Sequence, residues 1–576
     1  MNRTLRKPIL WTFLMVLCII TALKILFAGY DVDEQYAVAM AYRMLKGDLL
    51  LTDMWEPHQT SGFLCALLML PYLSLFSTTT GIFLYLRFCG LLLHGLTAFF
   101  LYRTLRRRFA PGYAFLLGCI AFFTLPKLMF LPEFSNLQTD FLLWAVLCLL
   151  RYYDPDLSRR DKPSLGYLYA AGSFMALEVL TYPSTILAFL AAFVCMLRYR
   201  GRRGHSAAAE LLGLILPCVL GAAAFLAVLL SYIPLSELGS LIAIVSSDGS
   251  HSAPLSQRLL QHAQSLGQLF LFFLLYALMA TGVLLICRFR TKKPFSAAFW
   301  CFLLLSCTLL GQVCIWLFAG QYPNYPMAEY FFLPVLLLIA LLRHKVGASP
   351  ALGFFVLTPL AAFLGILFFS NHPLLVSLPF LTPCVVGILS LPELQEYQQH
   401  PAETAAESSK KSTGRLRLMP QTLLVLWVCV LLFGRCYMLR TTGGTHYTVF
   451  DELSLLRQGP AVGLIADTPS VIRYRDNYRL VTESLPDGAK VFYMGTATDL
   501  YLMKDLEFCT PSTICSPTFD DKILPYFEQH PEKEPEYVVC DGGLLYTDPW
   551  VLSYIREHCL ETPVAVNDYL QIYQCR

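Results

Sequence analysis

Charged residues are scarce in this sequence, whereas apolar residues are abundant. Lys, Arg, Asp and Glu make up only 14% of the 576 residues, apolar residues make up 56%, and the mean hydropathy is +0.55. A soluble chain carries close to twice this charge fraction, about 25%. The scarcity of charge excludes a cytosolic enzyme, a disordered protein and a nucleic-acid-binding protein, and it indicates a chain that crosses a membrane several times.

Metal-ligand spacings are absent among the cysteines. Of the 19 cysteines, 14 are scattered through the apolar part of the chain, where cysteine behaves as a small apolar residue. The other five lie near the carboxyl terminus: Cys509, Cys515, Cys540, Cys559 and Cys575. In an extracytoplasmic tail this odd number could supply one or two disulfides, with a pairing that the sequence does not give.

The few charges are divided unevenly along the chain. From Arg440 onward 11 basic residues stand against 20 acidic ones, whereas the preceding part holds 32 basic and 20 acidic residues. The two parts therefore face different surroundings. The first apolar run, Pro8 to Ala28, follows three basic residues, which predicts a cytoplasmic amino terminus. This run is long for a signal peptide and lacks a clean cleavage site, so we expect a retained anchor.

Basic clusters at the cytoplasmic turns divide the apolar part into spans of roughly 17 to 25 residues. Together with the first anchor they make thirteen, near 80–102, 109–126, 137–153, 165–181, 182–197, 207–231, 268–287, 294–319, 326–342, 350–369, 374–391 and 420–438. The short run 63–76 contains Pro71 and would invert this topology, so we expect it to be re-entrant or to lie on the membrane surface. The acidic tail is then outside.

The predicted fold is a mainly α polytopic membrane protein with an extracytoplasmic α/β domain at its carboxyl end. The transmembrane domain covers residues 1–438, and a Gln-, Glu-, Ser- and Lys-rich stretch at 392–419 is typical of a flexible cytoplasmic linker. In residues 439–576 short apolar runs alternate with helical stretches, which indicates a small α/β domain. The long loops 29–79 and 234–264 both face outward, so any site should lie on the outer face.

Three carboxylates open the first external loop. Asp31, Asp33 and Glu34 lie within four residues of each other, directly after the first span. Apolar residues then recur at helical spacing, which predicts an amphipathic helix over residues 35–46 on the membrane surface. The simplest interpretation is that Asp33 caps this helix while Glu34 complements the helix dipole. Capping and catalysis are compatible roles.

A resemblance to a family rests on the order of several features. An Asp-Glu pair after the first span (Asp33, Glu34), a helix containing Tyr36, a Pro-containing apolar stretch, thirteen spans and an external tail follow one another. This order resembles the C-type glycosyltransferase superfamily, which uses polyprenyl-phosphate sugars and includes protein O-mannosyltransferases, aminoarabinose transferases and oligosaccharyltransferases. The resemblance implies that Asp33 and Glu34 are catalytic and that a sugar moves from a polyprenyl phosphate to an extracytoplasmic glycan, lipid or protein.

The chemistry of such a transfer agrees with this assignment. An acceptor hydroxyl that attacks an anomeric carbon must lose its proton, which a carboxylate can take as general base. The leaving phosphate is already a weak base, so it needs cations more than it needs an acid. We therefore expect one essential carboxylate surrounded by cations, and inversion at the anomeric carbon.

Substrate-binding roles are expected for further polar residues near the outer face. They are Asp31, Tyr36, His58, Arg87, Glu133, Asp140, His251 and Arg258. An arginine inside a span is functional by default, although near the end of a span it can instead reach the interface. Lys24, Lys127 and His262 are further candidates for the phosphate. His94 and Glu178 are also polar residues within spans, and hydrogen bonds between helices explain them equally well.

The resemblance implies that an acidic residue of the second external loop helps to hold the acceptor or a divalent metal ion. Glu133 is the first candidate and Asp140 the second, whereas the alternative is that Asn136 caps the next helix with Asp140 in its first turn. The resemblance also implies that loop 234–264 is mobile and covers the donor, with His251 and Arg258 as phosphate contacts.

The sequence departs from its resemblance in two places. No lysine occurs at residues 56–59, where aminoarabinose transferases have a Lys-Pro-Pro stretch, and the tail lacks the WWD-type motif of oligosaccharyltransferases. Peptide N-glycosylation is therefore not predicted. The expected partners are the polyprenyl-phosphate donor, the acceptor and the surrounding membrane lipid, without nucleic acid. A transporter or flippase of lipid-linked saccharides and a catalytically inactive scaffold are the alternatives.

Overall fold

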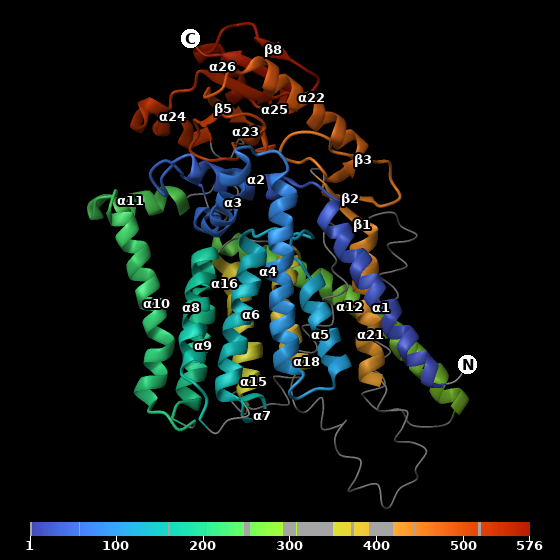
Figure 1. The fold of residues 1–576 in the computed structure, drawn as a ribbon. Helices are drawn as coiled ribbons and strands as arrows, with labels where there is room; N and C mark the ends of the chain where they lie inside the picture. Colours follow the sequence, from blue (N-terminus) through green and yellow to red (C-terminus); the bar gives the residue numbers. More distant parts are fainter. Residues whose placement is uncertain are drawn as a thin grey trace, which may run out of the picture.

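The structure is a computed structural model, and it describes residues 3–56, 58–158, 162–201, 203–246, 254–291, 307, 349–369, 374–390, 419–441, 444–515 and 520–576. A bundle of long helices lies beneath an α/β domain, and the chain runs from the bundle into this domain (Figure 1). The bundle contains α1 (Arg3–Phe27), α4 (Ile82–Leu105), α5 (Pro111–Phe123), α6 (Phe134–Tyr153), α7 (Pro155–Ser158), α8 (Gly166–Thr181), α9 (Ile186–Tyr199), α10 (Ala207–Leu230), α12 (Leu255–Thr291), α15 (Pro350–Leu352), α16 (Thr358–Phe369), α17 (Leu374–Ser377), α18 (Thr382–Leu389) and α21 (Met419–Tyr437).

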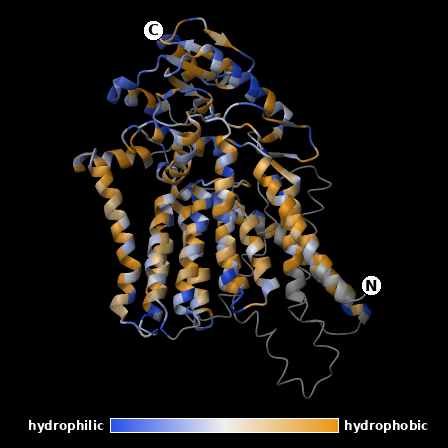
Figure 2. Cartoon of the chain, in the orientation of Figure 1, coloured by the Kyte–Doolittle hydropathy of each residue, from blue (hydrophilic) through white to orange (hydrophobic). Residues whose placement is uncertain are grey.

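The long helices have the composition of membrane spans. By length and composition alone, five helical segments of the described residues can cross a membrane: Ile9–Phe27, Gln59–Phe76, Ile82–Leu105, Ala207–Leu230 and Pro350–Phe369. The bundle is largely hydrophobic, whereas the domain above it carries more hydrophilic residues (Figure 2). Large apolar side chains of α1 and α10 are exposed on the outside of the bundle, where lipid rather than water is the natural neighbour.

Most of the predicted spans in the described residues are helices in the structure. The segments expected at 294–319 and 326–342 and the linker 392–419 lie outside the described residues, apart from residues 307 and 419. The outer loop 234–264 differs from its prediction, because residues 235–246 form helix α11 (Leu235–Ser246) and α12 already begins at Leu255. The last part of this loop, from Leu255 onward, therefore belongs to the same helix as the predicted span 268–287, because no residue between them ends the helix.

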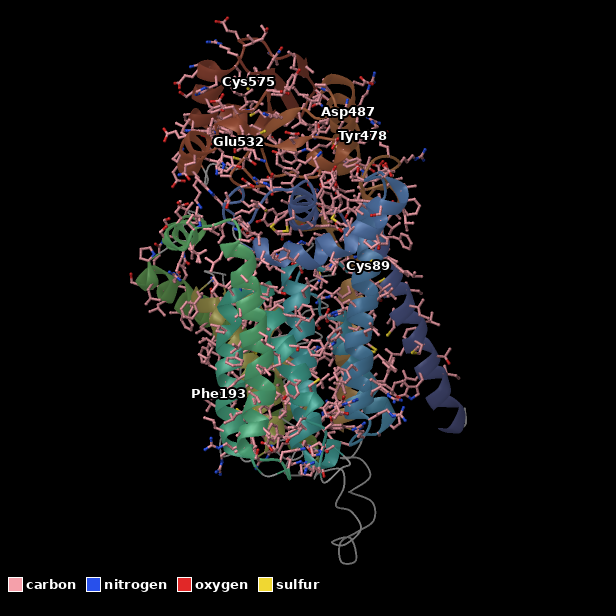
Figure 3. All side chains as sticks on the ribbon, turned by 60° about the vertical axis from the view of Figure 1, so that its left-hand side comes forward. Cys89, Phe193, Tyr478, Asp487, Glu532 and Cys575 are labelled. Atoms are coloured by element: carbon pink, nitrogen blue, oxygen red, sulfur yellow. The ribbon has the colours of Figure 1, made fainter. Side chains whose placement is uncertain are left out.

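Two helices lie across the upper ends of the bundle, beneath the α/β domain (Figure 1). They are α2 (Val32–Leu45) and α3 (Gly62–Phe76), and they pack against each other. Although α3 is apolar enough to cross a membrane, it lies across the bundle, in agreement with the prediction for residues 63–76. In Figure 3, side chains fill the space between Tyr478 in the domain and Cys89 near the upper end of α4.

Helix α2 is buried on nearly every side, so the prediction of an amphipathic surface helix is wrong. All residues from Glu34 to Arg43 are buried. One apolar core unites α2, α3 and the start of α4 with aromatic side chains of the tail, including Tyr474 and Tyr501. The sequence periodicity could not reveal this burial, because the residues that cover the outer face of α2 belong to the distant α/β domain.

The α/β domain is built on a five-stranded mixed sheet with the order β6-β5-β7-β9-β8. Strand β5 pairs in parallel with β6 and β7, whereas β9 is antiparallel to β7 and β8. The strands of the domain and its connection are β1 (Met438–Thr441), β2 (Gly444–Thr448), β3 (Leu453–Leu455), β4 (Ile465–Asp467), β5 (Lys490–Met494), β6 (Glu507–Phe508), β7 (Tyr537–Asp541), β8 (Ala565–Val566) and β9 (Leu570–Gln574). The helices are α22 (Thr468–Ser484), α23 (Leu500–Met503), α24 (Asp520–Gln529), α25 (Gly542–Thr547) and α26 (Pro549–His558). The predicted α/β tail is confirmed.

The chain after α1 lies between two strands that follow the last span. Gly29 donates its backbone N–H to Ile465 at 2.8 Å, and Tyr30 donates to the carbonyl of Arg440 at 3.0 Å. Gly29 has φ +98°, and a Cβ atom there would lie 2.7 Å from that carbonyl oxygen, so only glycine fits. Since α1 and α21 pack together, the segments that leave them emerge side by side. This pairing brings Arg440 next to the carboxylates of α2.

Candidate active site

The first carboxylate, Asp31, caps helix α2. Its backbone is extended, with φ −121° and ψ 151°, and its side chain accepts the N–H of Asp33 at 3.0 Å. The interpretation that Asp33 is the cap is therefore wrong. Two aspartates lie near the helix start, and Asp31 rather than Asp33 caps the helix. Burial raises the pKa of the Asp31 carboxyl, although Arg440, whose Nε lies 2.8 Å from it, opposes the shift.

The second carboxylate, Asp33, lies between two cations. Its Oδ2 atom accepts a hydrogen bond from Lys127 Nζ at 2.7 Å and another from Arg440 Nη2 at 2.8 Å. The Asp33 side chain is 34% exposed, so solvent or a substrate can reach it, whereas both cations are more deeply buried. The arrangement is a reachable carboxylate held by two cations, in a corner between the bundle and the domain.

The third carboxylate, Glu34, is fully buried against Arg87. The two side chains form a bidentate pair, with Arg87 Nε 2.5 Å from Oε1 and Nη2 2.6 Å from Oε2. Neither side chain is exposed. The guanidinium also donates to the carbonyls of Leu26 and Gly29, at 3.2 and 2.8 Å. This geometry fixes α2 to α4 and to the end of α1, and it leaves neither charge open to a ligand.

The second external loop contributes Glu133 and Lys127 to the same region. Glu133 caps α6, where it accepts the N–H of Ser135 at 2.9 Å and that of Asn136 at 2.8 Å. The alternative that Asn136 caps this helix is therefore wrong. Burial raises the pKa of Glu133, and Lys127 is the main opposing charge. Glu133 is thus a structural cap that lies close to the cation contacting Asp33.

A small aromatic cluster extends this corner to His58. The ring of Phe134 stacks on His58, with ring centroids 4.2 Å apart and an interplanar angle of 7°, and Lys127 Nζ lies 5.4 Å from the centre of the same Phe134 ring. His58 also contacts Tyr182 at 5.1 Å. The structure therefore brings His58 into the surroundings of Lys127 and Asp33.

The other predicted site residues lie elsewhere. Asp140 pairs with His94 across α4 and α6, at 2.7 Å, and Tyr36 contributes a hydrogen bond to the buried Glu56. Arg258 donates to the carbonyl of Phe368 at 2.7 Å, at the end of α16. His251 lies outside the described residues. Lys24 donates to the carbonyl of Met438, and His262 lies 3.2 Å from that of Leu367.

A metal-ligand set is not formed by the described residues. Among them, no three or more His, Cys, Asp or Glu side chains converge as a possible metal site. Asp31 and Asp33 instead direct their oxygens at Arg440 and Lys127, and these cations already neutralise the two carboxylates. The side chains around Asp33 therefore do not fit a divalent ion in this arrangement.

Arg440 is the site residue that sequence reasoning missed. It joins Asp31 and Asp33 although it lies 409 and 407 positions away from them. The available signal is its position, because Arg440 follows the last span just as the carboxylates follow the first. Lys127, by contrast, was among the predicted phosphate candidates.

No family model matches this chain, and no curated protein matches it in sequence. Its structure is similar to ArnT from Cupriavidus metallidurans bound to undecaprenyl phosphate, with 12% identity, a TM-score of 0.46 and coverage of 99% of this chain and 98% of that chain. It is also similar to an Archaeoglobus fulgidus oligosaccharyltransferase tethered with an acceptor peptide, with 12% identity, a TM-score of 0.43 and coverage of 98% and 74%. These likenesses concern overall arrangement, and the proposal below depends on the residues of this chain.

Proposed function

We propose that this protein is a membrane glycosyltransferase that transfers a sugar from a polyprenyl-phosphate donor to an extracytoplasmic acceptor. The observation that carries the proposal is the partly exposed Asp33 carboxylate between Lys127 and Arg440. This reaction requires a base for the hydroxyl acceptor and cations for the phosphate leaving group. Asp33 can serve as the base, and both cations lie within hydrogen-bond distance of its Oδ2 atom.

In the proposed reaction, Asp33 takes the proton of an acceptor hydroxyl while the hydroxyl oxygen attacks the anomeric carbon of the donor. The bond between that carbon and the phosphate oxygen breaks on the opposite face, which inverts the anomeric configuration. The released polyprenyl phosphate keeps the bonding electrons, and Lys127 and Arg440 stabilise its negative charge.

The contacts of Asp33 indicate how donor binding prepares this base. Lys127 and Arg440 both contact its Oδ2 atom, and neighbouring positive charges make a carboxylate a weaker base. A donor phosphate competes for the same two cations. When they turn toward the phosphate, Asp33 becomes a stronger base at the moment when a donor is present.

The position of Asp33 also suits the two substrates. The bundle below it has the apolar surface that a polyprenyl chain requires, and the α/β domain above it offers polar surface to an acceptor (Figure 2). Asp33 lies at the start of α2, the layer between these two parts.

The test is transfer of label from polyprenyl-phosphate hexose and pentose donors by membranes that contain the protein. Replacing Asp33 by Asn should lower the transfer rate about 100-fold or more, because the amide cannot accept the proton. The matched control is Asp476→Asn, since Asp476 also pairs with an arginine, Arg475, but on the outer surface of α22. Transfer by Asp33→Asn at the parental rate would refute the proposal.

A further inference from the structure

A cavity with polar and aromatic side chains in its wall lies beside the start of α2. It has a volume of about 180 Å³ and separates α2 from α22 and from the loop that follows β5. This volume is far above the roughly 15 Å³ that one water requires and below the roughly 300 Å³ of a typical drug-sized site. The cavity is therefore suited to one polar group of about the size of a single ring.

One residue of the cavity wall has a buried oxygen atom without a partner among the described residues. Gln35 lines the cavity, only 1% of the residue is exposed, and its Oε1 atom has no hydrogen-bond partner among the described residues. Buried polar atoms in native proteins are nearly always hydrogen-bonded, so this atom points to a ligand that donates an O–H or N–H.

The opposite walls add polar groups whose charges are already balanced. Tyr30 donates its hydroxyl to Asp499 Oδ2 at 2.6 Å, and Arg473 forms an ion pair with Asp541. Burial raises the pKa of Asp499 to about 7, so close to neutral pH this carboxyl is protonated in a large fraction of molecules. Because no unbalanced cation of the described residues lines the cavity, its chemistry favours a neutral ligand over a phosphate.

An aromatic surface completes the cavity. Tyr474 lines it, stacks on Tyr478 with an interplanar angle of 22°, and meets Tyr30 edge to face at 5.8 Å. An apolar ring with a few convergent amide, hydroxyl and carboxyl groups is the usual composition of a small-ligand site. The same combination matches a sugar ring, which has an apolar face and hydroxyl groups at its rim.

We propose that this cavity binds one sugar residue of a neutral glycan. Val32 lines the cavity, and it lies in sequence between Asp31 and Asp33. The cavity and the candidate base therefore both lie at the start of α2, although Asp33 itself is not part of the cavity wall. That this glycan is the acceptor rests on the function proposed above, whereas the binding itself does not.

The experiment measures binding without turnover. The full-length protein, purified in detergent, is mixed with maltose, lactose or N,N′-diacetylchitobiose, and with glucose 6-phosphate as an anionic comparison, and binding is detected by ligand-observed NMR. At least one neutral disaccharide should bind. Replacing Gln35 by Leu should weaken its binding at least tenfold, whereas Gln529→Leu, on an exposed position of α24, should leave it unchanged.

The fold of the Gln35→Leu variant is checked by its melting temperature. Replacing an unpartnered buried amide by an apolar side chain leaves no new polar group unpaired, so the melting temperature should equal or exceed that of the parent. A second variant, Ala497→Phe, fills the cavity from another wall and should abolish binding as well. A merely structural glutamine would instead lower the melting temperature without affecting saccharide binding.

Three results would overturn the inference: no neutral disaccharide binds the parent, glucose 6-phosphate binds better than all of them, or both variants bind like the parent. The Asp33→Asn variant separates this inference from the proposed function. If that variant transfers sugar at the parental rate while the parent binds saccharide, only the catalytic proposal fails. If it is inactive and the parent binds no saccharide, only the cavity inference fails.

Discussion

Replacing Arg87 by Met should destabilise the protein strongly, because it leaves a buried carboxylate without its cation. Arg87 and Glu34 are both completely buried and share two hydrogen bonds of 2.5 and 2.6 Å. The carbonyls of Leu26 and Gly29 lose their donor in the same variant. Removing one partner of a buried ion pair costs about 3 to 5 kcal/mol, so we expect the free energy of unfolding to fall by about this amount.

Removing both charges should recover most of this loss. In the double variant Arg87→Met and Glu34→Leu, neither charge is buried, and apolar replacement of a buried ion pair is often neutral or stabilising. The double variant should therefore lie closer to the parent than either single variant. The interaction free energy follows from the complete double-mutant cycle, measured by unfolding in detergent with increasing sodium dodecyl sulfate and checked by thermal melts.

The same cycle tests the prediction from sequence that Arg87 binds the donor phosphate. If Arg87→Met changes the free energy of unfolding by less than about 1 kcal/mol while raising KM for the donor, the pair is not a structural one and our reasoning is wrong. If the variant is unstable and the double variant regains both stability and transfer activity, Arg87 positions α2 and does not contact the donor.

Three further predictions concern the α/β domain. Burial raises the pKa of Asp499 to about 7, so the stability that its protonated carboxyl contributes is complete below about pH 4 and is lost as the pH rises to about 7. The melting temperature of the parent should therefore fall between pH 4 and 8, and that of Asp499→Asn should fall less. Equal falls in the two proteins would contradict this prediction. Glu56 accepts two hydrogen bonds from Thr513, so Glu56→Ala should lower the free energy of unfolding by about 1 to 3 kcal/mol. The variant should also be cleaved faster by limited proteolysis between the bundle and the domain. An unchanged cleavage rate would argue against this contact. The sulfur atoms of Cys559 and Cys575 lie 4.0 Å apart, so protein from an oxidising compartment should yield a disulfide-linked peptide by mass spectrometry. This disulfide should raise the free energy of unfolding by about 3 kcal/mol. Two freely alkylated thiols would contradict the prediction.

The sequence was sufficient to predict the architecture, because the relevant signals are local. Apolar runs, basic turns and the changed composition after the last span predict a helical bundle followed by an α/β domain, and the structure has both. The order of features around Asp33 also identified a carboxylate that the structure places beside cations. The roles of the individual residues at that site remain predictions until the proposed variants are measured.

The contacts of the site were less predictable, because each depends on a distant partner. The sequence predicts Glu34 as a second catalytic carboxylate, whereas in the structure Glu34 pairs with Arg87, 53 positions away. Arg440 reaches the carboxylates because the Tyr30 segment pairs with β1, a contact between distant parts of the chain. For His94 a hydrogen bond between helices was one of two interpretations, and its pairing with Asp140 agrees with it.

The joining of Asp31 and Asp33 to Arg440 has a consequence for the order in which the protein matures. A ribosome synthesises the two aspartates and Lys127 early and the guanidinium that joins the aspartates only after the final span, so a partly made chain carries this corner with one of its two cations. Chains truncated before residue 440 would thus enter the membrane with an incomplete centre. The corner can therefore be assembled only once the chain has been made beyond Arg440.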